Sequence, residues 1–230
     1  MQVQGLLFDK DGTLFDFNAT WSNWTVGIID HFAEGSAELA AHIATTIQFN
    51  LSERVFLPSS PIIAGTNREA AELVASALAD ADVDYVETYL AQAAAKAPLA
   101  PVVPLGPLLT EFRSQGLKLG VMTNDTEQGA RAHLSEANAL ELFDFVAGHD
   151  SGFGAKPDPD PLLAFAQKQE LDPRNVVMVG DSTHDLIAGR RAGMMTIGVL
   201  TGPAKEEELA HYADYILPHI GHLPNWLGRG

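Results

Sequence analysis

The sequence has no cysteine among its 230 residues. This absence excludes disulfide bonds, thiolate zinc sites and a cysteine nucleophile. Basic residues are also scarce, because 14 Lys and Arg stand against 30 Asp and Glu and leave a formal net charge of −16. A protein that binds the phosphates of nucleic acid or an anionic membrane needs clustered positive charge. We therefore expect neither nucleic acid nor membrane as a partner.

Long apolar runs are missing as well. The first eight residues carry no basic segment, and their short apolar run ends at Asp9, which is typical of neither a signal peptide nor a membrane span. With 46% hydrophobic and 19% charged residues, the composition is that of an ordinary globular chain rather than a disordered or fibrous one. We expect a soluble cytoplasmic protein, either a monomer or a homodimer.

Residues 16–97 differ in pattern from the rest of the chain. Apolar residues recur there at helical spacing, and Thr66 precedes a further helical stretch as a candidate N-cap. Nothing in this block alternates like a strand, so an all-helical unit is predicted. Trp21 and Trp24 are expected to lie in the core of this unit rather than to form a stacking platform.

Outside that block, strand and helix patterns alternate. This alternation predicts an α/β fold with a doubly wound, mostly parallel, Rossmann-like sheet covered by helices on both faces. The predicted domains are a core of residues 1–15 and 98–230 and an inserted helical cap of residues 16–97. Between them, residues 98–107 hold four prolines and are expected to form a stiff connector, with a polyproline ligand as the alternative. The predicted strands are 2–8, 117–122, 145–147, 176–179, 196–200 and 215–217, and the predicted core helices are 108–115, 127–136, 160–169 and 185–192.

Polar side chains follow three of the predicted strands. Ligands bind at the carboxyl edge of open parallel sheets, so these side chains are expected to converge there. Oxygen ligands without cysteine or clustered histidine suit a hard cation such as Mg²⁺, which also takes substrate phosphate as a ligand. The converging residues are Asp9 and Asp11, Thr123 and Asn124, Asp181, and Lys156 from a nearby loop.

Each piece has a simpler explanation when taken alone. Two acids at a strand end can be a solvated turn, and Thr123 with Asn124 can cap a helix. Asp181 and Asp185 can flank a helix start, and Lys156 can be a surface lysine. Their joint order along alternating strands and helices favours phosphoryl transfer, in which a carboxylate can serve as the nucleophile and a second acid as the proton donor.

Four segments carry a family resemblance that spans the chain. The segment 7–14, Leu-Phe-Asp-Lys-Asp-Gly-Thr-Leu, resembles the first motif of the haloacid dehalogenase (HAD) superfamily. Segments 121–124, 156–157 and 180–185 resemble its second, third and fourth motifs in the family's order. The helical insert after the first motif is similar to the subgroup with a helical cap, the phosphoglycolate-phosphatase-like branch.

This resemblance implies a role for each residue. Asp9 would be the nucleophile and a Mg²⁺ ligand, and Asp11 the general acid and base with a main-chain carbonyl on the metal. Asp181 would be a further metal ligand. The resemblance also implies that Thr123 and Asn124 hold phosphoryl oxygens. Lys156 would neutralise the negative charge of the nucleophile and of the phosphoryl group, and Asp185 would orient Lys156 or a metal-bound water.

Two features bear on the substrate. Lys10 occupies a place more commonly apolar in the family, and we expect it to be tolerated by pairing with an acid. The insert holds three basic residues against eleven acids, a balance of 3 − 11 = −8. Arg54 and Arg68, on either side of the loop 57–61, are candidates for cap contacts with substrate, although solvated surface arginines are the simpler interpretation. So few cations favour a small phosphorylated metabolite of modest charge.

The leading prediction is a Mg²⁺-dependent phosphomonoester hydrolase that forms an aspartyl-phosphate. A phosphomutase would use the same residues and return the phosphoryl group to a sugar. A haloacid dehalogenase would need no metal and lacks an acid two residues after the nucleophile, so Asp11 argues against it. From another class, a receiver-like phospho-accepting switch also combines clustered acids, Thr, Lys and Mg²⁺, but the length and the insert speak against it.

Overall fold

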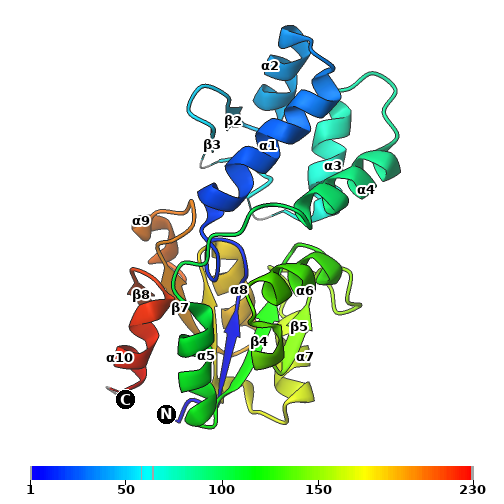
Figure 1. The fold of residues 1–230 in the computed structure, drawn as a ribbon. Coiled ribbons are helices and arrows are strands. Elements are labelled where there is room, and N and C mark those ends of the chain that lie inside the picture. The colour runs from blue at the N-terminus through cyan, green and yellow to red at the C-terminus, as the bar shows by residue number, and fades with distance from the viewer. Residues whose placement is uncertain (1, 58, 64, 229–230) are drawn as a thin grey trace. The chain divides into compact units, whose positions relative to one another are not determined.

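The computed structural model describes residues 2–57, 59–63 and 65–228 (Figure 1). The chain forms two compact units: residues 1–17 together with 99–230, and residues 18–98. The first unit is made of two chain segments because the second unit is inserted after the first strand. Within the loop 57–61 of the insert, Pro58 lies outside the described residues. Among the described residues, none of the helices combines the length and the apolar character needed to cross a bilayer.

The first unit is built on a six-stranded sheet whose strand pairs are all parallel. Its strand order is β5-β4-β1-β6-β7-β8, so β1 lies between β4 and β6. The chain fills one side of β1 first and then the other, which places the point where the strand order reverses at β1. The strands are β1 (Gly5–Phe8), β4 (Lys118–Met122), β5 (Phe145–Ala147), β6 (Val176–Gly180), β7 (Met195–Val199) and β8 (Tyr215–Leu217).

Each face of this sheet buries its own apolar core. Successive side chains of a strand point to opposite faces, and β1 shows this directly. Leu6 and Phe8 pack with Phe112 in one core, whereas Leu7 packs with Phe165 in the other. The doubly wound arrangement is confirmed. The helices of this unit are α5 (Leu105–Ser114), α6 (Glu127–Glu136), α7 (Asp160–Lys168), α8 (Thr183–Arg191), α9 (Glu206–Leu209) and α10 (Leu223–Leu227), with 3₁₀ turns at Leu140–Leu142, Pro173–Asn175 and Ile220–His222.

Some boundaries differ from the prediction. α5 begins at Leu105, three residues earlier than expected, and contains Pro107. Residues in the first turn of a helix have no intrahelical partner for their N–H groups, so proline is tolerated there. α9 and α10 were not predicted, because four or five residues are too few to display a helical period.

In its described residues, the second unit contains four helices and one small hairpin, and the hairpin corrects the all-helical prediction. Strands β2 and β3 pair antiparallel, with Phe49 opposite Phe56 and their rings 5.0 Å apart. Asn50 Oδ1 closes the turn by accepting hydrogen bonds from the main-chain N–H groups of Ser52 and Glu53. Two-residue strands are too short to show alternation. The elements are α1 (Phe17–Ala33), α2 (Ala37–Thr46), β2 (Phe49–Asn50), β3 (Val55–Phe56), α3 (Asn67–Ser76) and α4 (Val83–Ala94).

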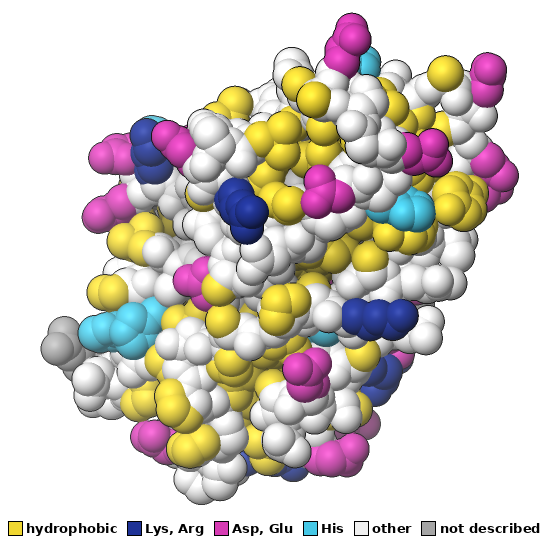
Figure 2. All heavy atoms as spheres, turned by 45° about the horizontal axis from the view of Figure 1, so that its top comes forward, with side chains coloured by type: hydrophobic (Ala, Val, Ile, Leu, Met, Phe, Trp, Pro, Cys, Tyr) yellow, Lys and Arg dark blue, Asp and Glu magenta, His cyan; other side chains and the backbone are white. Residues whose placement is uncertain are grey.

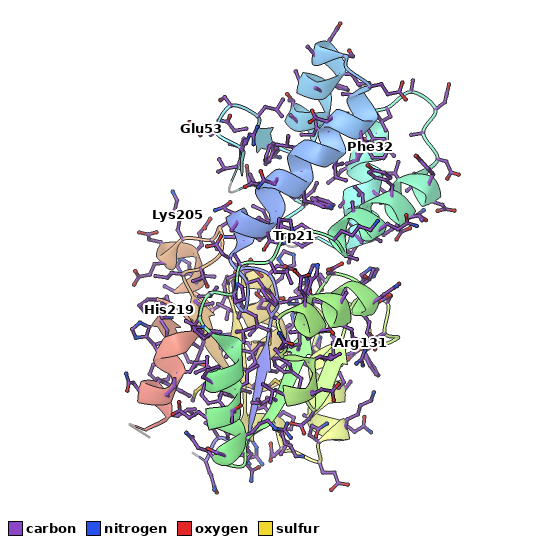
Figure 3. All side chains as sticks on the ribbon, viewed as in Figure 1. Trp21, Phe32, Glu53, Arg131, Lys205 and His219 are labelled. Carbon is purple, nitrogen blue, oxygen red and sulfur yellow. The ribbon has the colours of Figure 1, made fainter. Side chains whose placement is uncertain are left out.

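Local signals in the insert were good guides. The predicted N-cap Thr66 accepts a hydrogen bond from the Glu69 N–H at its Oγ1, and the Thr66 N–H donates to Glu69 Oε2, which makes a capping box. Trp21, labelled on α1 in Figure 3, packs edge-to-face against Trp24 with ring centroids 5.1 Å apart, but both residues are only half-buried, which corrects the expectation that they lie in the core. Acidic side chains are scattered over the face drawn in Figure 2, with few Lys and Arg among them, as the net charge leads one to expect.

Candidate active site

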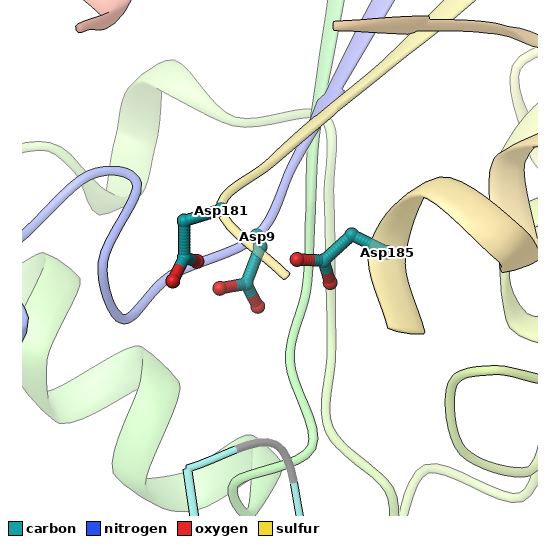
Figure 4. A group of neighbouring side chains, drawn as sticks. All are labelled: Asp9, Asp181 and Asp185. Atoms are coloured by element: carbon teal, nitrogen blue, oxygen red, sulfur yellow. The ribbon is translucent and has the colours of Figure 1, made fainter. Parts of the chain in front are cut away.

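Three buried carboxyl groups meet at the carboxyl edge of the sheet. Asp9 follows β1, Asp181 follows β6, and Asp185 lies in the first turn of α8. One carboxylate oxygen from each lies within 4.8 Å of the other two (Figure 4). The three residues are 7%, 3% and 1% exposed. Strand order explains why Asp9 and Asp181 lie close together, because β1 and β6 are neighbouring parallel strands whose carboxyl ends lie side by side.

One lysine joins this cluster. Lys156 Nζ lies 2.5 Å from Asp9 Oδ1 and 2.7 Å from Asp185 Oδ1. Its side chain is almost fully buried. If all four groups are ionised, the cluster carries −3 + 1 = −2, so two negative charges stay uncompensated in a buried setting. Uncompensated buried charge is costly, which makes this place attractive for a cation.

The pKa values reflect this imbalance. Burial, together with the neighbouring Asp185 and Asp11, raises the pKa of Asp9 from 3.8 to about 7 although Lys156 acts to lower it. Burial and the charges of Asp9 and Asp185 likewise raise the pKa of Asp181 well above its usual value. Burial acts to lower the pKa of Lys156, but Asp185 and Asp9 outweigh it and raise that pKa. Because Lys156 divides its charge between two acids, neither acid is fully compensated.

Local structure holds Asp185 in place. Asp185 Oδ2 accepts hydrogen bonds from the Ser182 main-chain N–H at 3.0 Å and from Ser182 Oγ at 2.7 Å, which forms a capping box at the start of α8. Its Oδ1 accepts from Lys156. Asp185 therefore caps the helix and also orients Lys156. Gly180 makes room for it, because a Cβ at that position would overlap the Asp185 carboxyl group.

Asp181 is confined by residues of the turn after β1 and of the loop after β7. Thr13 Oγ1 donates to Asp181 Oδ1 at 3.2 Å. A Cβ at Gly12 or at Gly202 would overlap the Asp181 carboxyl group, so only glycine fits at either position. Thr201 Oγ1 donates to the Gly12 carbonyl at 2.6 Å and thereby ties the loop after β7 to the turn after β1. Thr201 and Gly202 adjoin none of the four motifs, so the sequence did not predict their contacts with Gly12 and Asp181.

The two residues after β4 lie beside the same cluster. Asn124 Oδ1 accepts from the Lys156 N–H and its Nδ2 donates to the Lys156 carbonyl, both at 2.9 Å. Thr123 Oγ1 accepts from the Asp125 N–H at 3.1 Å. Asn124 thus positions the backbone that carries Lys156. The phosphoryl contacts expected of Thr123 and Asn124 stay predictions, and the side-chain amide of Asn124 is already engaged.

Lys10 is paired with acids, as expected. Its Nζ lies 2.8 Å from Asp11 Oδ2 and 3.0 Å from Asp125 Oδ2, and its side chain is fully buried. Burial acts to lower the pKa of Lys10, but Asp11 and Asp125 outweigh it and raise that pKa. The expected pairing is confirmed, although the sequence did not indicate Asp125 as a partner.

Comparison with known proteins gives this arrangement a family. The sequence pattern of the haloacid dehalogenase-like hydrolases matches residues 3–193. The chain belongs to the haloacid dehalogenase-like hydrolase family. This membership decides against the receiver-like alternative. It agrees with the four motifs, which lie within the matched segment.

Individual relatives of this family resemble the chain over different lengths. "Pyrophosphatase PpaX" of Bacillus mycoides is 33% identical over 122 residues, which are 52% of this chain and 56% of that protein. "Phosphoglycolate phosphatase" of Psychrobacter arcticus is 28% identical over 202 residues, 88% of this chain and 85% of that protein. The crystal structure of a HAD phosphatase from Thermococcus onnurineus shares the fold, with a TM-score of 0.70 at 20% identity over 98% of each chain.

The two arginines proposed for a cap lie in the second unit. Arg68 forms ion pairs with Glu72, Asp84 and Glu87 at 3.2, 2.5 and 2.8 Å. Its guanidinium group is thus occupied within the insert itself, which weakens the expectation that it contacts substrate. Arg54 lies in the β2–β3 turn with a left-handed backbone conformation, φ 55°. Its substrate contact stays a prediction.

The donor set of this family member suits a hard divalent cation. Every candidate ligand is an oxygen, the three carboxylates are buried and close together, and their charge exceeds that of the lysine. Mg²⁺ takes oxygen ligands and is commonly held by one or two protein carboxylates plus substrate phosphate. Asp9 and Asp181 are the carboxylates best placed to hold it, since both Asp185 oxygens accept hydrogen bonds from the protein.

Proposed function

We propose that this chain is a Mg²⁺-dependent phosphomonoester hydrolase that acts on a small phosphorylated metabolite in the cytoplasm through an aspartyl-phosphate on Asp9. The observation that carries the proposal is the buried cluster of Asp9, Asp181 and Asp185, three carboxyl groups with Lys156 as their basic partner. Such a cluster is suited to a divalent cation and a bound phosphate together. Its members follow neighbouring strands of a hydrolase fold.

In the first step, Asp9 attacks the phosphorus atom of the ester. A bond forms between an Asp9 carboxylate oxygen and phosphorus while the bond from phosphorus to the leaving oxygen breaks. Asp11 gives its proton to that oxygen, so the product leaves as an alcohol. Lys156 offsets the negative charge of Asp9 and of the arriving phosphate. Mg²⁺ held by Asp9, Asp181 and the Asp11 carbonyl would supply charge neutralisation of the phosphoryl oxygens.

In the second step, water attacks the phosphorus atom of the aspartyl-phosphate. Asp11, now a carboxylate, takes a proton from the water, and the bond between Asp9 and phosphorus breaks. Inorganic phosphate leaves, Asp9 returns to its carboxylate form, and Asp11 is protonated again. Thr123 and Asn124 are proposed to hold the phosphoryl oxygens throughout.

The proposed substrate class is a small phosphorylated metabolite. Two relatives are named phosphoglycolate phosphatase and pyrophosphatase, and both are named for small phosphorylated substrates. The insert supplies few positive charges, which disfavours a highly charged leaving group. We propose that the insert acts as a cap that excludes water and selects the leaving group, with Arg54 as its candidate contact.

The direct test is turnover of p-nitrophenyl phosphate by the purified protein. We expect many turnovers with Mg²⁺, none in EDTA, and recovery on adding Mg²⁺ back. Asp9→Asn should abolish turnover while the protein stays folded, and Asp172→Asn, at the amino end of the strand β6, is the matched control. Activity of Asp9→Asn within about tenfold of wild type would refute the nucleophile, and full activity in EDTA would remove the metal from the proposal.

The intermediate and the competing phosphomutase are tested together. Enzyme quenched in acid during turnover should carry phosphate that hydroxylamine releases, as expected of an acyl phosphate, and Asp9→Asn should carry none. Steady release of inorganic phosphate supports a hydrolase. A requirement for a sugar bisphosphate, with a sugar phosphate as the product, would identify a phosphomutase instead.

A further inference from the structure

A second buried charge cluster lies beside the one that holds Asp9. Lys10 Nζ has three acceptors: Asp11 Oδ2 at 2.8 Å, His133 Nδ1 at 2.9 Å and Asp125 Oδ2 at 3.0 Å. A lysine ammonium has three N–H donors and no acceptor, so the facing His133 nitrogen must accept. The Lys10 side chain is fully buried, and His133 is fully buried as well.

Two of these acceptors belong to α6, one just before its start and one in its last turn. Asp125 precedes the N-cap residue Thr126, and its Oδ1 accepts a hydrogen bond from the Thr126 N–H at 2.7 Å. His133 lies on the buried face of the helix, where its ring meets Phe15 edge-on at 6.4 Å. Both residues are thus fixed by a packed helix. Lys10 connects that helix to the turn that follows β1.

The third acceptor is the side chain proposed as the general acid and base. Both Asp11 oxygens face Lys10, at 3.1 Å for Oδ1 and 2.8 Å for Oδ2. The Asp11 side chain keeps 15% of its surface exposed, so it is reachable from solvent. The backbone of the turn is held independently, because the N–H groups of Leu14 and Phe15 both donate to the Lys10 carbonyl. The Lys10 ammonium adds a constraint on the side chain itself.

We propose that Lys10 is a positioning residue that holds the Asp11 carboxyl group in its working orientation by anchoring it to Asp125, just before α6, and to His133, in the last turn of that helix. The inference rests on the proposed role of Asp11 in proton transfer. A carboxyl group on a turn has several orientations, and a proton donor placed even slightly wrongly loses much of its effect. An ammonium fixed by two further partners restricts those orientations.

The test uses two substrates of nearly equal shape. Phenyl phosphate and p-nitrophenyl phosphate differ by a nitro group, which makes p-nitrophenolate leave readily without a proton, whereas phenolate needs one more strongly. The ratio of their kcat/KM values therefore reports proton donation in the first step, when the leaving group departs. A role confined to folding would change both kcat/KM values alike and leave their ratio unchanged.

We expect Lys10→Met to lower the phenyl to p-nitrophenyl ratio by at least about tenfold, and Lys10→Arg to restore most of it. A ratio that rises, or one that stays within about twofold of wild type, overturns the inference.

Two further variants test whether a changed ratio comes from misfolding or from any loss of a lysine. Lys10→Met leaves buried acids uncompensated, so the double variant Lys10→Met with Asp125→Asn removes both charges and is expected to fold while keeping the lowered ratio. Lys118→Met, at the amino end of β4 and 46% exposed, is the matched control and should keep the wild-type ratio.

Asp11→Asn distinguishes failure of the Lys10 inference from failure of the proposed proton donation by Asp11. If Asp11→Asn lowers the ratio and neither Lys10→Met nor the double variant does, the inference about Lys10 fails and the proposed function stands. If Asp11→Asn leaves the ratio unchanged, proton donation by Asp11 fails, and the inference fails with it. Activity that is lost equally on both substrates in Lys10→Met and in the double variant also overturns the positioning role.

Discussion

The unusual pKa of Asp9 makes the stability of the metal-free protein depend on pH. Its pKa is about 7 in the folded protein against 3.8 for an ordinary aspartate. Between these values the folded protein keeps a proton that the unfolded chain has lost, so the folded state is favoured at low pH and loses that advantage as the pH rises. One proton is worth 1.36 kcal/mol per pH unit, which predicts a loss of about 3 kcal/mol between pH 5 and 8.

Bound Mg²⁺ should remove this loss. Metal ligands must be deprotonated, so the cation competes with the proton and stabilises the folded protein most at high pH. Urea unfolding of metal-free protein at several pH values, repeated in excess Mg²⁺, measures both effects through the extrapolated free energy of unfolding. A change of this size is a large part of the 5–15 kcal/mol that is typical of a domain, so it is readily resolved.

A control separates Asp9 from the general effect of the protein's negative charge. Asp9→Asn has no carboxyl group at this position, and we expect its metal-free form to lose the part of the pH dependence that Asp9 contributes, while Asp181, whose pKa burial also raises, keeps its own part. Asp172→Asn should keep the whole pH dependence, because pairing with Arg174 lowers the pKa of Asp172 to about 2, outside the tested range. If wild type and Asp9→Asn lose stability equally between pH 5 and 8, the reasoning about the buried cluster is wrong.

Three further outcomes follow from the same contacts. Lys156→Met should cost the metal-free protein about 3–5 kcal/mol in urea unfolding because it strands buried carboxylates, and a loss below about 1 kcal/mol would contradict that account. Gly202→Ala should weaken Mg²⁺ binding at least about tenfold by calorimetry, because the added Cβ displaces the Asp181 carboxyl group. Gly106 faces open space, so Gly106→Ala should keep the wild-type affinity. Equal Mg²⁺ affinities of the two variants would reject the steric argument. Arg68→Ala should leave KM for the best substrate within about twofold of wild type, because three acids occupy the Arg68 guanidinium group. Arg54→Ala should raise KM for that substrate. An unchanged KM in Arg54→Ala would show that Arg54 does not contact the substrate.

The elements of the first unit followed closely from sequence pattern. The predicted helix 127–136 and strands 145–147 and 215–217 have the observed bounds. Alternating strands and helices leave few possible topologies, because parallel strands need crossover connections with one hand. The hairpin β2–β3 escaped prediction because its strands are two residues long, and its stability comes from a ring contact and a side-chain turn rather than from a repeating pattern.

The residues around the site divide in the same way. Asp9 and Asp181 stood out because polar side chains directly after buried strands are conspicuous, and parallel strand order brings those ends together. Asp185 stood out as the last residue of the segment 180–185. Gly202 carries no such mark, and Asp125, although it lies in the polar segment after β4, gives no sign of its partner. Each matters through one contact, Gly202 with the Asp181 carboxyl group and Asp125 with Lys10, and such a contact exists only after two distant segments pack.

The sequence by itself determined the alternating architecture, the family and the order of the acidic residues along the chain. These depend on local periodicity and on short motifs, which are properties of neighbouring residues. Only the tertiary structure decided that Lys156 lies between Asp9 and Asp185, that Lys10 binds Asp11 and that Asn124 holds the Lys156 backbone. Burial and charge act through distance in space, and the fold sets that distance between side chains that are far apart in the chain, such as Lys156 and Asp9 at 147 positions.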